Sequence, residues 1–120
     1  MKKILVVEDD VSINKALTIR LRAAGYEVCS AQDGLLATCA AKREIPDAMV
    51  LDISMPAGDG FSIVERVQEM PELEGVPFIF LTASKRPEFR ERAEELGATA
   101  FFEKPYDAAE LLAAIEGAVN

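Results

Sequence analysis

The 120-residue sequence contains no histidine and only two cysteines. Without histidine, the chain has no Ser-His or Cys-His catalytic pair, no histidine metal ligand and no phosphohistidine of its own. Cys29 and Cys39 do not have the spacing of a disulfide framework or of a metal site. We therefore expect two free thiols that pack as small hydrophobic side chains.

Positive charge is also scarce, since 13 Lys and Arg residues face 21 Asp and Glu residues and the formal net charge is −8. This balance argues against nucleic-acid binding by this chain, because duplex binding depends on Lys and Arg contacts with phosphates. No apolar run reaches 18 residues, so we expect no membrane span. The apolar stretch near the N-terminus is too short for a signal peptide, and we expect a cytoplasmic protein.

Half of the residues are hydrophobic, which is enough for the core of one domain over residues 1–120. Residues 48–52 form an apolar run that is too short for a helix and too continuous for a half-exposed strand. Such a run is typical of a buried strand in a parallel sheet. Similar runs or alternating patterns predict five strands, at residues 3–7, 26–31, 48–52, 78–82 and 99–103.

Helical patterns follow each predicted strand. They predict helices at about 11–24, 34–43 and 60–70, a fourth that Ser84 caps and Gly97 ends, and a fifth that Asp107 caps. Helical spacing predicts three inner faces, formed by Ile13, Ala16, Leu17, Leu21 and Ala24 in the first helix, Leu35, Leu36 and Cys39 in the second, and Phe61, Val64 and Val67 in the third.

Alternating strands and helices predict the α/β class, here a (βα)5 doubly wound, five-stranded parallel sheet of the flavodoxin-like kind. In such sheets, ligands bind at the C-terminal ends of the strands. Chemically active residues stand at four of these ends: Glu8 and Asp9, Asp52, Thr82, and Lys104. If the strand order is 2-1-3-4-5, four of the strands are consecutive, and these side chains converge on one site.

The converging groups suit phosphoryl transfer to a carboxylate. Three neighbouring carboxylates repel one another unless a cation lies between them, and an all-oxygen site suits Mg²⁺ or Mn²⁺. Lys104 adds a second positive centre and Thr82 a hydroxyl. Each residue alone also has a structural interpretation, as a helix cap, turn former, strand residue or surface lysine. Their occurrence together, each at the same end of its strand, favours a phosphoryl-transfer site.

Four segments carry a family resemblance: ILVVEDD, VLDISMPAGDG, FLTAS and FFEKP. Over essentially all 120 residues, the chain resembles a response-regulator receiver domain, the fold of the chemotaxis response regulator. The resemblance implies that Asp52 is the phosphoacceptor and that Lys104 contacts the phosphoryl group. It also implies that Thr82 is the switch hydroxyl.

The same resemblance implies a metal site made by Asp9, its acidic neighbour Glu8, Asp52 and the backbone carbonyl of Ser54. Glu8 replaces the more frequent Asp of the family and keeps the charge. Phe101 matches the aromatic residue that changes rotamer with the switch hydroxyl. It has no hydroxyl of its own, so the hydrogen bond of a tyrosine is absent there, and its role in the core is an equally good interpretation.

The chain has no P-loop or other glycine-rich nucleotide motif, so ATP is not the expected direct donor. The resemblance implies that a partner histidine kinase or histidine phosphotransfer protein donates the phosphoryl group to Asp52. Phosphorylation would then switch the face formed by the fourth helix, fifth strand and fifth helix toward a downstream effector protein. On this hypothesis the chain catalyses only its own phosphotransfer and hydrolysis, and is not an enzyme for a separate substrate.

Two other functions stay open at this stage. A small Mg²⁺-dependent phosphohydrolase would also form an aspartyl phosphate, but such enzymes usually carry the nucleophile after the first strand and need a substrate-binding cap. An interaction module could keep the fold without accepting phosphate, although the complete set of Asp9, Asp52, Thr82 and Lys104 argues against it. The sequence leaves open the partners, and whether phosphorylation causes homodimerisation.

Overall fold

The computed structural model describes residues 1–55 and 59–120. Pro56, Ala57 and Gly58 of the VLDISMPAGDG segment lie outside the described residues. The strands are β1 (Lys3–Val7), β2 (Glu27–Ala31), β3 (Ala48–Asp52), β4 (Phe78–Thr82) and β5 (Ala100–Glu103). The helices are α1 (Val11–Ala23), α2 (Gly34–Glu44), α3 (Gly60–Gln68), α4 (Pro87–Leu96) and α5 (Ala108–Val119), with a short 3₁₀ turn, η1 (Pro71–Leu73).

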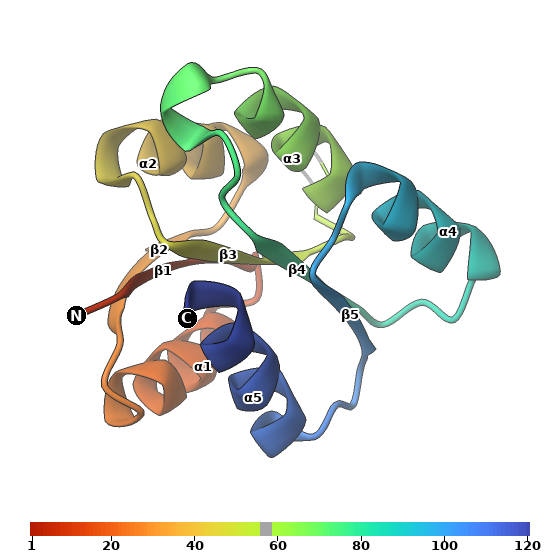
Figure 1. The fold of residues 1–120 in the computed structure, drawn as a ribbon. Helices are drawn as coiled ribbons and strands as arrows, with labels where there is room; N and C mark the ends of the chain where they lie inside the picture. The colour runs from red at the N-terminus through yellow and green to blue at the C-terminus, as the bar shows by residue number, and fades with distance from the viewer. Residues whose placement is uncertain (56–58) are drawn as a thin grey trace.

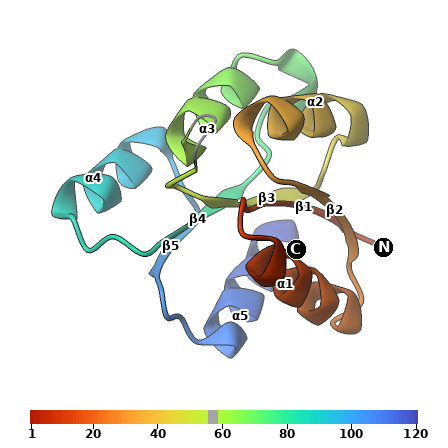
Figure 2. The same ribbon diagram turned by 180° about the vertical axis from the view of Figure 1, so that it is seen from behind.

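The five strands form one parallel sheet in the order β2-β1-β3-β4-β5, which confirms the predicted fold class (Figure 1). Helices α2, α3 and α4 cover one face of the sheet, and α1 and α5 cover the other, as Figure 2 shows from behind. The two β-sheet faces therefore both contact helices, as expected for parallel strands joined by crossover helices.

Alternate residues of the central strands serve two separate cores. Leu5, Met49 and Phe80 belong to the core beneath α2, α3 and α4. Their neighbours Ile4, Val50 and Ile79 belong to the core beneath α1 and α5. Because side chains alternate along a strand, a strand buried on both faces needs a continuous apolar run. This explains why β3 and β4 contain no polar residue before their last position.

Aspartates cap four of the helices. Asp10 accepts a hydrogen bond from the backbone N–H of Ile13 at 3.0 Å, and Asp33, Asp59 and Asp107 cap α2, α3 and α5 in the same way. Helix α4 differs, because Pro87 is its first residue and no side chain caps it. The predicted cap at Ser84 is therefore wrong. The Ser84 hydroxyl instead accepts a hydrogen bond from the N–H of Arg86 at 3.2 Å, in the turn before the helix.

Two of the predicted inner helix faces need correction. In α1, Leu17 and Leu21 are buried as predicted, but Ile13, Ala16 and Ala24 are exposed. The third buried residue of α1 is Asn14. The buried face of α1 is therefore formed by residues 14, 17 and 21. Asn14 can be buried there because its side-chain amide donates hydrogen bonds to backbone carbonyls.

In α2, the buried residues are Gly34, Ala37, Ala40 and Ala41, while Leu35, Leu36 and Cys39 are exposed. The alanines have the i, i+3, i+4 spacing of one helix face, and their small side chains let the helix approach the sheet closely. Both cysteines are free thiols as predicted, but Cys39 is not packed in the core. The predicted face of α3 is confirmed, because Phe61, Val64 and Val67 are all buried.

Among the described residues, no helix combines the length and the apolar composition that crossing a membrane requires.

Candidate functional site

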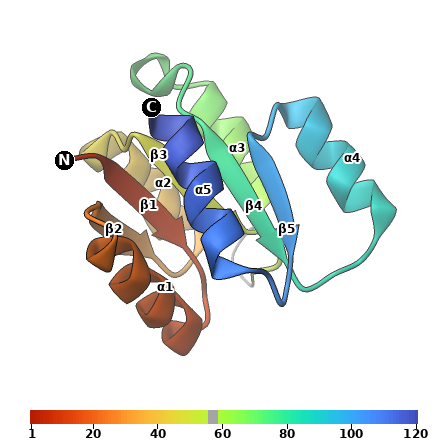
Figure 3. The ribbon, with the colours of Figure 1, turned by 60° about the horizontal axis from the view of Figure 1, so that its bottom comes forward.

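The site lies where β1, β3, β4 and β5 end. Figure 3 shows the strands running side by side toward the same edge of the sheet. The register pairs Asp52 with Leu81 and Thr82 with Glu103, so each of these strand ends stands beside the next. The predicted site residues come from segments separated by up to 96 positions, and the parallel sheet brings their segments to one edge.

Glu8, Asp9 and Asp52 form an acidic cluster in which one oxygen of each carboxylate lies within 4.8 Å of the others. Glu8 is 3% exposed and Asp52 is 6% exposed. The ammonium group of Lys104 donates hydrogen bonds to Glu8 Oε1 and to Asp52 Oδ2, both at 3.0 Å. The structure therefore brings four of the predicted site residues into one network.

Burial raises the pKa of Glu8 to about 8, and the neighbouring Asp52 carboxylate acts in the same direction. Burial alone would lower the pKa of Lys104, but its hydrogen bonds to Glu8 and Asp52 outweigh this effect and raise it. Lys104 is thus held in its charged form, whereas Glu8 retains a proton more readily than an exposed glutamate.

Glu8 Oε2 is buried and has no hydrogen-bond partner among the described residues. A buried carboxyl oxygen without a partner is costly, and one ammonium group supplies too little positive charge for all three carboxyl groups to be ionised together. A divalent cation bound by oxygen ligands would satisfy both needs. The residues present therefore fit a Mg²⁺ site of the kind that the sequence predicted.

Ser54 and Thr82 also lie at this edge, where they form hydrogen bonds with neighbouring residues. The N–H of Ser54 donates to Asp52 Oδ1 at 3.1 Å and so holds the carboxylate in place. The metal-binding role of the Ser54 carbonyl stays a prediction. Thr82 is fully buried, and its hydroxyl oxygen accepts a hydrogen bond from the N–H of Ser84 at 3.0 Å. Its hydroxyl proton remains available for another acceptor.

Phe101 occupies β5 beside Phe80 of β4, and its side chain is partly buried against the core beneath α2, α3 and α4. The guanidinium group of Arg90 lies over its ring, 4.6 Å from the ring centre. This is a cation–π contact between α4 and β5. Arg90 was not among the predicted site residues, because one of the two arginines in a charged helix gives no sequence signal for such a contact.

Two positioning residues were also absent from the prediction. Asn14 donates from Nδ2 to the backbone carbonyl of Glu8 at 3.0 Å and to that of Ala31 at 3.4 Å, which fixes the loop that carries the acidic pair. Gly60 begins α3 directly behind the end of β3, the strand that ends in Asp52. A Cβ atom there would lie 2.8 Å from the carbonyl oxygen of Asp52, so no side chain fits without a shift. The sequence did hold a signal for Asn14, because it is a polar residue at helical spacing from the buried Leu17 and Leu21.

An open cleft of about 470 Å³ lies beside the acidic cluster. Asp9 and Ser54 form part of its lining, together with the apolar side chains of Met55, Phe61 and Phe89. The cleft leaves the acidic edge accessible to a partner that approaches from solvent.

The chain matches the family model described as "Response regulator receiver domain" over residues 4–116. It is 41% identical over 119 residues to the "Probable transcriptional regulator ycf27" of Porphyridium aerugineum, with 99% of this chain and 48% of the relative covered. It is 32% identical over 115 residues to the "DNA-binding dual master transcriptional regulator RpaA" of Synechocystis sp., with 96% and 48% covered. The chain thus spans about half the length of these curated relatives.

Solved structures of similar fold include the chemotaxis protein CheY4 of Vibrio cholerae, with a TM-score of 0.91, 32% identity and 98% of each chain covered. Another is the receiver domain of the sensor histidine kinase PA1611 from Pseudomonas aeruginosa, with a TM-score of 0.88 and 30% identity. That match covers 98% of this chain and 97% of the other, whose structure is described with a magnesium ion coordinated in the active site cleft.

Proposed function

The chain belongs to the response regulator receiver domains, and from this premise we propose that Asp52 is its phosphoacceptor. The observation that supports the proposal is the environment of the Asp52 carboxylate. One oxygen accepts from the N–H of Ser54 and the other from Lys104, while Glu8 and Asp9 lie within reach of a shared cation. A nucleophilic carboxylate flanked by fixed positive charge is what phosphoryl transfer requires.

The donor in this proposal is a phosphohistidine of a partner histidine kinase or histidine phosphotransfer protein. An Asp52 oxygen forms a bond to phosphorus, the bond from phosphorus to the imidazole nitrogen breaks, and the imidazole takes up a proton from water. Lys104 stays at the site and pairs with the negative charge that accumulates on the phosphoryl oxygens. Since the chain acts on its own carboxylate, we propose no separate substrate and no enzymatic turnover.

We assign Glu8, Asp9, Asp52 and the carbonyl of Ser54 as the residues that would hold Mg²⁺, or Mn²⁺ in its place. Bound there, the cation supplies positive charge to the transferring phosphoryl group. The buried, unpartnered oxygen of Glu8 supports this assignment, because it has no acceptor role within the described part of the chain.

The output in this proposal is a protein contact on the face of α4, β5 and α5. Phosphorylation adds a charge of about −1.5 to −2 and new acceptor oxygens beside the hydroxyl of Thr82. Movement of Thr82 toward them vacates space that Phe101 on the adjacent strand can fill, which changes the face presented to an effector protein or a second copy of the domain.

Intact mass after incubation with Mg²⁺ and a small acyl-phosphate donor tests the proposal. We expect the wild type to gain one phosphoryl group and an Asp52→Asn variant to gain none. If the folded wild type gains no phosphoryl group and binds no Mg²⁺, the chain is an interaction module that keeps only the fold. Repeated turnover of a phosphoester substrate would instead indicate a phosphohydrolase.

A further inference from the structure

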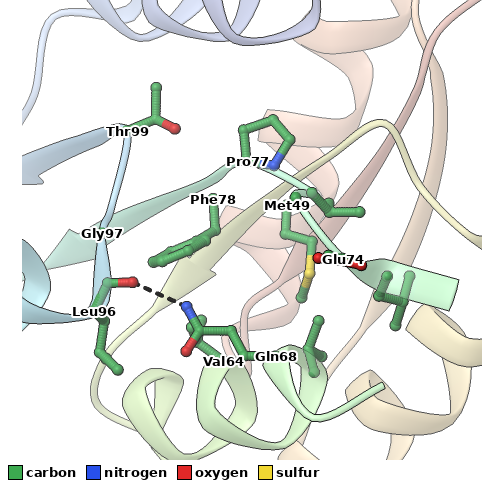
Figure 4. Close-up of a pocket in the computed structure, with 13 residues that line it drawn as sticks. Met49, Val64, Gln68, Glu74, Pro77, Phe78, Leu96, Gly97 and Thr99 are labelled. Atoms are coloured by element: carbon green, nitrogen blue, oxygen red, sulfur yellow. Dashed lines mark hydrogen bonds between the residues drawn. The ribbon is translucent and has the colours of Figure 1, made fainter. Parts of the chain in front are cut away.

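A second cavity, of about 420 Å³, is shown in Figure 4. It lies where β3, β4 and β5 begin, and so at the opposite edge of the sheet from Asp52. Its lining includes Met49 near the start of β3, Phe78 at the start of β4, and Thr99 just before β5. Figure 4 shows Phe78 and Met49 pointing from the strands toward Val64 and Gln68 of α3. The cavity is therefore separate from the phosphoacceptor site and shares none of its residues.

The floor of this cavity is apolar. Met49, Val64 and Phe78 are buried, and Val67 and Leu73 complete the floor. A cavity of roughly 150 Å³ is enough to bind benzene, so this one has room for a considerably larger ring compound. An aromatic ligand can also contact the ring of Phe78 and the sulfur of Met49 favourably.

The rim of the cavity offers hydrogen-bond acceptors and negative charge. None of its 13 lining residues is Lys or Arg, and Glu74 makes no ion pair within residues 1–55 and 59–120. The side-chain N–H of Gln68 donates to the carbonyl of Leu96 at 2.9 Å, the dashed line in Figure 4, which leaves the Gln68 oxygen as a further acceptor. Such a rim favours a donor group, and a cation above all.

Two helices end at the cavity, and the end of α4 adds to this polarity, whereas Arg66 in the last turn of α3 offsets the end of that helix. Gln68 is the last residue of α3 and Leu96 the last of α4, and both line the cavity. The C-terminal end of a helix carries a partial negative charge. Helix α4 has no basic residue in its last turn, where Glu94 and Glu95 stand instead. Arg92 pairs with Glu95 at 3.5 Å, so Glu94 is the charge of the wrong sign for this helix end, and a cation bound nearby would offset it.

We propose that this cavity is a binding site for a small aromatic amine, whose ring lies over the floor that Phe78 and Met49 form side by side and whose ammonium group lies at the rim beside Glu74. The site does not depend on the proposed phosphorylation function. An Asp52→Asn variant is therefore expected to bind the amine as the wild type does, which separates failure of one proposal from failure of the other.

The test is an NMR titration of backbone amides, at constant ionic strength, with 2-phenylethylamine as the probe and 3-phenylpropionate as its anionic counterpart. We expect saturable shifts for the amine at Gly75, Leu96, Gly97 and Thr99, and none for the carboxylate. Equal binding of both compounds would contradict the charge argument. Shifts spread over the acidic surface without saturation would show only non-specific attraction to a chain of net charge −8, and would overturn the proposal.

Two variants at exposed positions make the test specific. Thr99→Trp places an indole at the mouth of the cavity, and we expect it to weaken binding at least about tenfold. Glu74→Gln removes the rim charge and should raise the Kd about two- to fivefold, the range of exposed ion pairs. Glu72→Gln is the matched control, since Glu72 is exposed nearby but does not line the cavity. An identical Kd for Glu74→Gln, Glu72→Gln and the wild type would exclude Glu74 as the partner of the amine.

Discussion

The ammonium group of Lys104 lies 3.0 Å from Glu8 Oε1, and so joins the end of β5 to the end of β1 across 96 positions of sequence. The same group lies 3.0 Å from Asp52 Oδ2 at the end of β3. Its side chain is 19% exposed, so the three strand ends share one largely buried cation. This arrangement makes Lys104 a structural counter-ion before any phosphoryl group arrives.

Replacing Lys104 should therefore destabilise the unphosphorylated protein. In a Lys104→Met variant, Glu8 and Asp52 lose their counter-ion while the apolar volume is retained, and we expect a loss of about 1–3 kcal/mol in the free energy of unfolding in metal-free buffer. Urea unfolding measures this loss. Adding Mg²⁺ should reverse part of it, because a second cation then serves the same carboxylates.

The matched control is Lys85→Met. Lys85 is 78% exposed and pairs with Glu103 only at 3.7 Å, so its loss should change the free energy of unfolding by less than about 0.5 kcal/mol. If both variants unfold at the same urea concentration as the wild type, Lys104 does not act as a structural counter-ion.

Glu8 should make Mg²⁺ binding depend on pH. Its pKa in the folded, metal-free protein is raised to about 8, and a cation binds only after the proton leaves. We expect the Mg²⁺ affinity to rise as the pH increases from about 6 to about 8, by up to about tenfold per pH unit, and then to level off. Titrations of the wild type and a Glu8→Gln variant at several pH values measure this dependence.

The Glu8→Gln variant should bind Mg²⁺ more weakly and lose the slope in this pH range. A slope that persists in that variant would assign the titrating group elsewhere.

The stability of the metal-free protein should depend on pH in the opposite direction to its Mg²⁺ affinity. Because the folded pKa lies above the usual value of 4.5, the unfolded chain releases this proton first. The contribution of Glu8 to metal-free stability therefore decreases as the pH rises from about 4.5 to about 8.

Local sequence patterns predicted the strands better than the helix faces. The strands β3 and β4 are buried on both sides, so each of their positions had to be apolar and the runs were unambiguous. Helix α2 was misjudged because its alanines, rather than Leu35 and Leu36, face the core. Hydrophobicity alone favours the larger residues for the core, whereas the residues of α2 that are buried in the structure are the small ones.

The acidic cluster and Lys104 could be predicted because parallel strands end at one edge, so a strand-by-strand reading placed these residues together. The contacts of Asn14, Gly60 and Arg90 could not be predicted in the same way. Each depends on how a helix packs against a strand or loop, and the distances that decide this packing are set by the whole core rather than by neighbouring residues in the sequence.

Asn14 should contribute to stability through its two backbone acceptors. Asn14→Ala leaves the carbonyls of Glu8 and Ala31 without this buried donor, and we expect a loss of about 1–3 kcal/mol. Ser12→Ala in the same helix is the control, because Ser12 is exposed and should matter little. Thermal unfolding of both variants measures this loss. Equal melting temperatures for the two variants would contradict a stabilising role of Asn14. A slower phosphorylation of Asn14→Ala in the acyl-phosphate assay is expected as well, since the acidic loop loses its anchor.

Gly60 should tolerate no side chain, although alanine is the better helix former. In Gly60→Ala, the new Cβ would meet the carbonyl oxygen of Asp52 at 2.8 Å and the Cα of Ile53 at 3.3 Å, both of them backbone atoms. Relieving that contact must shift either α3 or the end of β3, at an expected cost of about 1–3 kcal/mol.

Gly117 in α5 is the matched control, because no atom lies within 4 Å of its added Cβ. There the same substitution should stabilise the protein by about 0.5–1 kcal/mol, since alanine loses less backbone entropy in a helix. Urea unfolding should thus move in opposite directions for the two variants, and phosphorylation should slow only in Gly60→Ala. Stabilisation of both variants would show that the backbone behind Asp52 yields without penalty.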